Sequence, residues 1–134
     1  MMVRRTWLAA AAGVMVLAGA GGAVAQRQSA LNSLNAVERG QWQLRDGEGA
    51  VRGICLRNPS TLLQLRHWGA QCEHFVVENG GTSATIRYTC PGRGHGRTSI
   101  TVETAHTVVI DTSGIVDGAP FSEQYEARRV GQCQ

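Results

Sequence analysis

Two cysteine–histidine pairs in the middle of the chain carry the residue types best suited to chemistry. Cys72 and His74 are two positions apart, and His95 follows Cys90 after four intervening residues. Thiolate and imidazole groups are common Zn²⁺ ligands, so the four side chains could form a metal site or the centre of a thiol enzyme. An even number of cysteines in a small exported chain favours disulfides instead, with His74 hydrogen-bonded to Tyr88. We therefore expect no metal and no other cofactor.

A glycine-rich segment supplies a second candidate, an anion site. It reads Gly92-Arg93-Gly94-His95-Gly96-Arg97. Glycines allow backbone N–H groups to converge on an anion, and Arg93, His95 and Arg97 would add positive charge. The segment is not a nucleotide-binding loop, because no Gly-Lys-Ser/Thr follows it. The simpler interpretation is a mobile hairpin loop with solvated arginines that tolerates substitution.

Aromatic side chains provide a third candidate, a pocket for an apolar ligand. Trp42, Trp68 and Tyr125 could line such a pocket between a sheet and a helix, although ordinary core packing is the more common outcome. A catalytic set is harder to find. The chain contains neither Gly-x-Ser-x-Gly nor Cys-x-x-Cys, and its carboxylates are isolated from one another. The sequence therefore favours a protein that is not an enzyme.

The stretch from Cys72 to Cys90 positions many of these residues. Two β-rich runs flank Asn79-Gly80-Gly81, a turn sequence typical of hairpins. A three-residue loop over residues 80–82 sets the register, because opposed residues then share a face. The predicted facing pairs are Asn79 with Ser83, Val76 with Ile86, His74 with Tyr88, and Cys72 with Cys90. The face that carries both cysteines is apolar, and we expect it to form core.

The remaining segments mostly alternate with the period of β-strands. Strands are expected over residues 40–46, 50–56, 98–104, 107–111 and 119–129, with turn residues at 46–49 and 111–118. Residues 58–66 give the best helix signal, because Asn58 can cap the helix and Pro59 suits its first position. The sequence predicts a mainly β fold. We expect a curved antiparallel sheet or partly closed barrel of six or seven strands with one short helix.

Four cysteines allow three pairings. The hairpin register favours Cys72–Cys90, since directly opposed antiparallel residues lie within disulfide range. Cys55–Cys133 then follows by elimination, and the final segment can reach the end of an early strand. The main alternative joins Cys55 to Cys72 and Cys90 to Cys133.

The first 25 residues resemble an export signal. Arg4 and Arg5 precede an apolar run, and Ala23-Val24-Ala25 is a cleavage signal before Gln26. The paired arginines leave both general secretion and twin-arginine export open. We expect residues 26–39 to form a tail or short helix and residues 40–134 a disulfide-linked β domain. The mature protein would then be periplasmic or secreted, with no stable membrane anchor.

Composition narrows the class of partner. The chain of 134 residues has thirteen basic residues, all arginine, and ten acidic residues. Removal of Arg4 and Arg5 leaves eleven arginines against ten acids, a net charge of +1. That balance gives no general support for binding nucleic acid or a membrane surface.

Several motifs together resemble a bacterial family of small exported proteins known only as a domain of unknown function. The motifs are Gly40-Gln41-Trp42, Cys55-Leu56, the pair Cys72 and Cys90 around a glycine turn, and Arg129-Val130-Gly131-Gln132-Cys133. Residues 57 and 58 depart from the Thr-Pro usual after Cys-Leu, and the last third lacks the family's Met- and Gly-rich stretch. The resemblance implies an envelope location and disulfides, and it implies no activity.

Two functional hypotheses follow. The first is a non-enzymatic envelope protein that binds a small apolar ligand or another envelope protein through the sheet's concave face or an edge. The second is a metal-dependent or thiol enzyme that uses Cys72, His74, Cys90 and His95. The two differ in whether the cysteines are free thiols.

Overall fold

A computed structural model describes residues 31–134, so the predicted signal segment and residues 26–30 lie outside the described part. Seven antiparallel strands form one open sheet in the order β2-β1-β7-β6-β5-β4-β3. This confirms the predicted fold class. The strands are β1 (Gly40–Asp46), β2 (Val51–Leu56), β3 (Glu73–Asn79), β4 (Ser83–Cys90), β5 (Gly94–Thr104), β6 (Thr107–Val116) and β7 (Ala119–Gly131).

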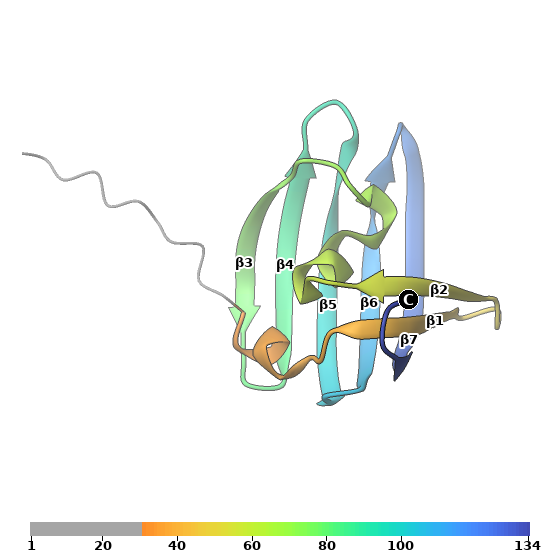
Figure 1. The fold of residues 1–134 in the computed structure, drawn as a ribbon. Coiled ribbons are helices and arrows are strands. Elements are labelled where there is room, and N and C mark those ends of the chain that lie inside the picture. The colour runs from red at the N-terminus through yellow and green to blue at the C-terminus, as the bar shows by residue number, and fades with distance from the viewer. Residues whose placement is uncertain (1–30) are drawn as a thin grey trace, which may run out of the picture.

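The sheet curls strongly along its width. Strands β3 to β7 run side by side, whereas β1 and β2 cross in front of β6 and β7 in Figure 1. Two 3-10 helices, η1 (Asn32–Ala36) and η2 (Pro59–His67), pack near β4 and β5 and against each other. The curled sheet thus wraps around these helices and encloses the core.

Apolar residues at alternate positions build that core. In β5 and β6 the inward side chains are almost inaccessible, for example Ile100 and Ile110 at 0% exposure. The opposite face of the same strands carries polar side chains such as Ser99 and Asp111. One buried face and one solvated face are typical of an antiparallel sheet. The core therefore lies between the concave face of the sheet and η2.

The helix η2 begins as the sequence predicts. The side chain of Asn58 accepts a hydrogen bond from the Ser60 N–H at 3.0 Å, and Pro59 is the first helical residue. The helix has 3-10 geometry and is interrupted at Gln64, whose backbone is not helical. Its buried residues are Leu62, Leu63, Leu65 and His67.

The central hairpin confirms most of the predicted register. His74 pairs with Tyr88 and Val76 with Ile86, but a β-bulge between Val76 and Glu78 shifts the pairing nearer the turn. Asn79 consequently faces Ala84 instead of the predicted Ser83. Only the β4 half of the predicted core face is buried, because β3 lies at the edge of the sheet.

Both predicted disulfides are present. Cys72–Cys90 links the two sides of the central hairpin, with Cα atoms 4.2 Å apart. Cys55–Cys133 joins β2 to the C-terminal segment, with Cα atoms 5.5 Å apart. Disulfides of this kind are typical of proteins that mature in an oxidising compartment. Within residues 31–134 no helix is long and apolar enough to cross a membrane.

Two segments predicted as loop or turn are strand. The supposed loop Gly92–Arg97 contains only a tight turn, and β5 already begins at Gly94. An added Cβ at Gly96 would lie 2.5 Å from the Tyr88 ring, and one at Gly94 would lie 2.0 Å from the Ile115 carbonyl oxygen. These glycines permit close packing, so the expectation of a mobile loop was wrong. Residues 111–116 likewise continue β6, which leaves only Asp117 and Gly118 for the turn.

Candidate functional site

The cysteine–histidine set does not assemble as a ligand cluster. Cys72 and Cys90 are bonded to each other, and no free cysteine remains in residues 31–134. A disulfide sulfur is not a thiolate, so these two residues offer no thiolate ligands in this fold. His74 Nε2 lies 2.8 Å from the Gln64 side-chain oxygen. This contact replaces the hydrogen bond to Tyr88 that the sequence led us to expect. Burial lowers the pKa of His74, which favours its neutral form.

The predicted anion-binding residues point to different partners. The Arg93 Nε donates to Asp117 Oδ1 at 2.9 Å, so the Asp117 carboxylate offsets the positive charge of that guanidinium. Arg97 lies directly opposite Arg87 on the neighbouring strand, and His95 lies opposite Thr89. Binding of an anion by these residues stays a prediction, although they lie on a strand and turn and not in a flexible loop.

The three predicted ligand-binding aromatics occupy unlike environments. Trp42 is completely inaccessible, and its Nε1 donates to the Glu38 carbonyl at 3.0 Å. Trp68 is 48% exposed immediately after η2. Tyr125 lines a small open cavity of about 240 Å³ with Arg52 and Arg66. A single pocket shared by all three residues is therefore not present in this conformation.

A charged cluster surrounds Tyr125. Its hydroxyl donates to Glu123 Oε2, and the Arg66 guanidinium pairs with the other carboxylate oxygen. Burial raises the pKa of Tyr125 to about 12, and the hydrogen bond to Glu123 adds to the shift. A phenol with so high a pKa stays protonated at neutral pH, so it acts as a hydrogen-bond donor to Glu123.

A buried histidine is the polar feature that the sequence analysis missed. His67 is 0% exposed, with Nδ1 3.0 Å from the Tyr88 hydroxyl and Nε2 3.2 Å from the Arg93 carbonyl oxygen. Both contacts are satisfied when the Tyr88 O–H donates to Nδ1 and the Nε2–H donates to the carbonyl. The arrangement ties η2 to β4 and to the turn before β5. In the sequence, His67 only follows the predicted helix, and that position gives no indication of its hydrogen-bond partners.

The outer edge of β3 is unusually apolar. Phe75, Val76 and Val77 are 56%, 47% and 52% exposed, and they are consecutive in the strand. We call these three residues the apolar edge. The strand ends the sheet, so one side of its backbone has no neighbouring strand within residues 31–134. Glu73 and Glu78 flank the apolar edge on both sides.

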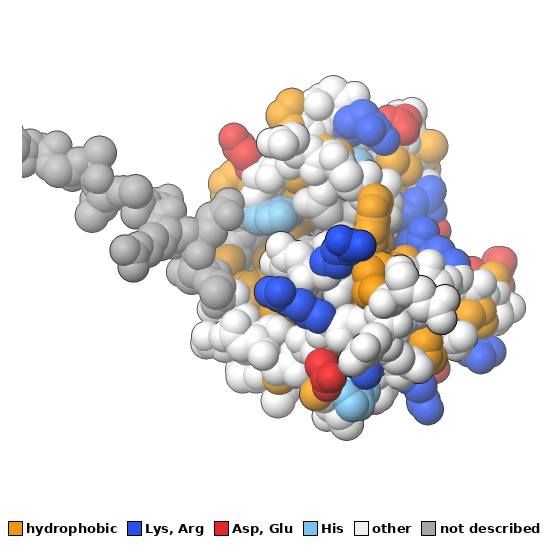
Figure 2. All heavy atoms as spheres, in the orientation of Figure 1, with side chains coloured by type: hydrophobic (Ala, Val, Ile, Leu, Met, Phe, Trp, Pro, Cys, Tyr) orange, Lys and Arg blue, Asp and Glu red, His pale blue; other side chains and the backbone are white. Residues whose placement is uncertain are grey.

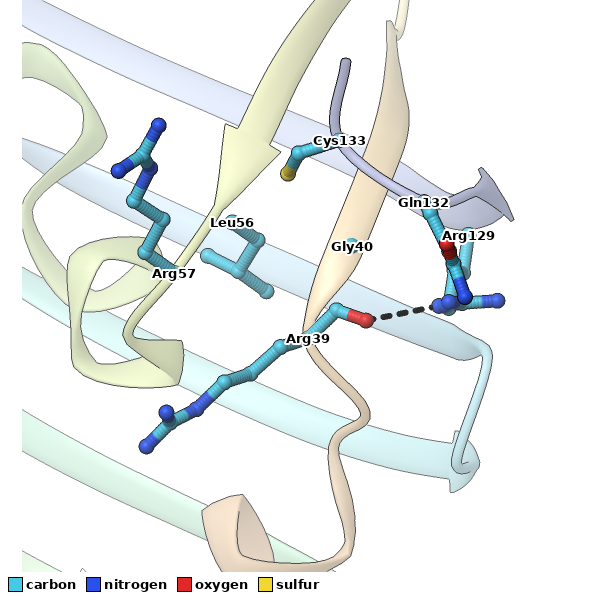
Figure 3. A pocket seen from close by; sticks show the side chains of 7 residues that line it. All are labelled: Arg39, Gly40, Leu56, Arg57, Arg129, Gln132 and Cys133. Carbon is cyan, nitrogen blue, oxygen red and sulfur yellow. Dashed lines mark hydrogen bonds between the residues drawn. The ribbon is translucent and has the colours of Figure 1, made fainter.

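A second surface feature lies where β1 begins, near the opposite edge of the sheet. An open cavity of about 530 Å³ is formed there by three stretches of chain (Figure 3). We call it the arginine cavity, because three of its seven lining residues are arginines. The lining residues are Arg39, Gly40, Leu56, Arg57, Arg129, Gln132 and Cys133. Figure 2 shows basic side chains gathered on this face of the molecule.

Three short sequence motifs that lie far apart along the chain meet at the arginine cavity. Gly40, Leu56, Arg129 and Cys133 come from the first, second and last motifs, and the fold brings them into one wall. Nothing in the sequence of these motifs indicates that they are neighbours. The pairing of β1 with β7, which no short-range pattern reveals, is what brings them together.

Glu38 lies at the rim of the same region. Its carboxylate contacts His106 Nε2 at 2.5 Å and Arg129 Nη2 at 3.5 Å. The hydrogen bond from His106 lowers the pKa of Glu38, and the Arg129 charge lowers it further. The carboxylate is therefore ionised at neutral pH and holds the Arg129 guanidinium beside the cavity.

Comparison with protein-family models found no match to this chain. Comparisons with curated proteins and with solved structures found no match either.

Proposed function

We propose that the protein is a non-enzymatic binding module of the cell envelope. It would capture an extended segment of another envelope protein along the apolar edge of β3. The observation that carries this proposal is three consecutive, half-exposed apolar side chains on a strand that has a neighbour on only one side within residues 31–134. Such strands recruit partners by strand addition, in which backbone hydrogen bonds supply affinity and side-chain pockets supply specificity.

Burial of the apolar edge would contribute substantially to binding. Each of the three side chains still has about half of its surface to lose, which is worth about 1 kcal/mol per residue. An edge of this kind is also an aggregation hazard, and natural proteins usually protect such edges with charges or bulges. The presence of three exposed apolar residues on such an edge supports a partner that covers them.

The flanking charges and the bulge define the partner's chemistry. Glu73 and Glu78 favour a segment with arginine or lysine on either side of its apolar residues. The bulge between Val76 and Glu78 interrupts regular pairing, which discriminates against an arbitrary strand.

The filled core favours this partner over a small apolar ligand. Trp42, Ile100 and Ile110 on the concave side are fully inaccessible, so a ligand there would have to displace packed side chains. The apolar edge needs no such rearrangement.

Site-specific photo-crosslinking in the intact envelope tests the proposal. A photoreactive residue at position 75 should crosslink to one envelope protein, and Val77→Lys in the same chain should abolish that product. Val51→Lys is the matched control, because Val51 is 48% exposed on the opposite edge strand β2. Slowed amide exchange in β3 of the isolated complex would identify strand addition. Equal crosslinking with Val77→Lys and with Val51→Lys would refute the proposal.

A further inference from the structure

The arginine cavity collects positive charge without acidic residues in its wall. Arg39, Arg57 and Arg129 are among the residues that line about 530 Å³ of open space. That volume is within the usual range for small-molecule sites. The mature chain has nearly equal numbers of arginines and acids, so such a local excess is not explained by overall composition.

One of the three guanidinium groups is fixed in place. The Arg129 Nε donates to the Arg39 carbonyl oxygen at 2.8 Å, as the dashed line in Figure 3 marks, and Nη2 lies 3.5 Å from Glu38. The group also packs on Gly40, where an added Cβ would lie only 2.5 Å from Nε. The Arg129 side chain is 18% exposed. Its position is set before any ligand arrives, which lowers the entropic cost of binding.

Its Nη1 donor makes no hydrogen bond within residues 31–134. A cavity wall thus presents a rigid, partly buried cation with spare hydrogen-bond capacity. Guanidinium groups in this situation suit oxyanions, because their planar fork matches two oxygens at once.

The other two arginines are free to move. Arg39 and Arg57 are exposed, and neither forms an ion pair with a described carboxylate. In Figure 3 their side chains extend in different directions, away from Leu56. The cavity thus has one fixed guanidinium group and two that no described carboxylate holds in place.

Charge balance selects the class of anion. Glu38 already offsets part of the Arg129 charge, which leaves two uncompensated positive charges at Arg39 and Arg57. A phosphate monoester carries about −1.5 to −2 at neutral pH, which matches them, whereas a simple carboxylate carries only −1.

We propose that the arginine cavity binds a phosphate group, either free or as the headgroup of a phosphomonoester lipid. Arg129 supplies the fixed hydrogen-bond donor, and Arg39 and Arg57 close over the anion. This site is independent of the proposed partner-binding edge, because it lies near β2 at the other end of the sheet.

Two titrations of the purified, disulfide-bonded protein test the site. Calorimetry with inorganic phosphate measures binding of the free anion. Cosedimentation with phosphatidylcholine vesicles, with and without phosphatidic acid, measures binding of the lipid headgroup. The variant is the double substitution Arg39→Gln with Arg57→Gln. The matched control is Arg87→Gln with Arg97→Gln, which removes the same charge from two exposed, facing arginines elsewhere on the sheet.

We expect binding in at least one titration, and the titration that binds identifies the source of the phosphate. Loss of two charged hydrogen-bond donors should weaken affinity at least about tenfold in the cavity variant, while the control pair stays within about twofold of the unsubstituted protein. Equal loss in both variants would mean that net charge alone attracts phosphate. That result, an unaffected cavity variant, or no binding in either titration would overturn the proposal.

Discussion

The two edge strands of this sheet manage the same hazard in different ways. The β2 edge is short, contains Gly53 and Arg52, and is tied through Cys55 to the C-terminal segment. The β3 edge has acidic residues at both ends but keeps Phe75, Val76 and Val77 uncovered between them. Both strands expose backbone groups that could pair with another chain. Each edge also has a disulfide, since Cys72 directly precedes β3 and is bonded to Cys90. The two edges therefore differ in their surface chemistry: one lies beside basic side chains, and the other is apolar and accessible.

That difference indicates a division of roles between the ends of the sheet. An apolar strand edge suits an extended protein segment, whereas guanidinium groups near β2 suit an anion. The core between the two ends is filled, so neither surface needs a cavity in the interior.

Removal of the disulfides should show the largest difference between the two edges. Substitution of Cys55 and Cys133 by serine opens a loop of 78 residues, and substitution of Cys72 and Cys90 opens one of 18 residues. The chain-entropy model assigns these bridges about 4.5 and about 3 kcal/mol respectively. Urea unfolding of the two double variants measures the order. A larger loss at Cys72–Cys90 would mean that β3 depends on its bridge more than β2 does.

The second-largest difference between the two edges should come from the stability that nearby side-chain hydrogen bonds contribute. Tyr88→Phe leaves the buried His67 Nδ1 without a donor, which should reduce the free energy of unfolding by about 1–3 kcal/mol. Tyr125→Phe is the control near the other edge. There Glu123 keeps its contact with Arg66, so we expect a loss under about 1 kcal/mol. Chemical unfolding at pH 7 measures the loss of unfolding free energy in each variant. Equal losses would contradict the expectation that the buried hydrogen bonds of His67 stabilise the fold more than those of Tyr125.

Lysine substitutions on the edges should change association more than stability. Val77→Lys should leave the free energy of unfolding within about 0.5 kcal/mol, because the side chain is half exposed. It should also reduce self-association at high protein concentration, since an edge charge opposes strand pairing. Light scattering against Val51→Lys provides the comparison. Equal self-association of both variants would mean that the apolar edge is not the surface that drives self-association.

The smallest expected effect concerns the rim of the arginine cavity. The pKa of Glu38 is lowered by His106 and Arg129, so its ionised form stabilises the folded state. That contribution is present above the ordinary carboxylate pKa of 4.5 and is lost as the pH falls below it. The stability difference between the unsubstituted protein and Glu38→Gln should therefore shrink between pH 6 and pH 3. A constant difference over that range would exclude an electrostatic role for Glu38.

The fold was more predictable than the candidate sites, for a physical reason. Strand periodicity and the turn at Asn79–Gly81 are local, so β1, the central hairpin and the disulfide between Cys72 and Cys90 followed from neighbouring residues. The arginine cavity depends on the pairing of Gln41 with Gly131, which leaves no local pattern.

Glycine was the main source of error. Gly94 and Gly96 were interpreted as flexible, although they allow close approach of Ile115 and of the Tyr88 ring. Glycine is equally compatible with both explanations in sequence, and only the packing partner distinguishes them. The exposed state of Val76, on the face expected to form core, was missed for a related reason, because alternation does not tell an edge strand from a central one.

The pairing of the first strand with the last has a consequence for the time course of folding. Strands β3 to β7 form a meander in which every strand contacts its successor in sequence, so each pairing closes only a short loop. The β1–β2 hairpin has to wait for β7, because the residues of β1 pair with residues 79 (Asp46 with Tyr125) to 90 (Gln41 with Gly131) positions further along the chain. When the chain emerges with its N-terminus first, Trp42 and Leu44 therefore remain without their neighbours in β7 until that strand arrives. Cys133 lies just beyond the end of β7, so formation of its disulfide with Cys55 would mark the docking of β7 beside β1.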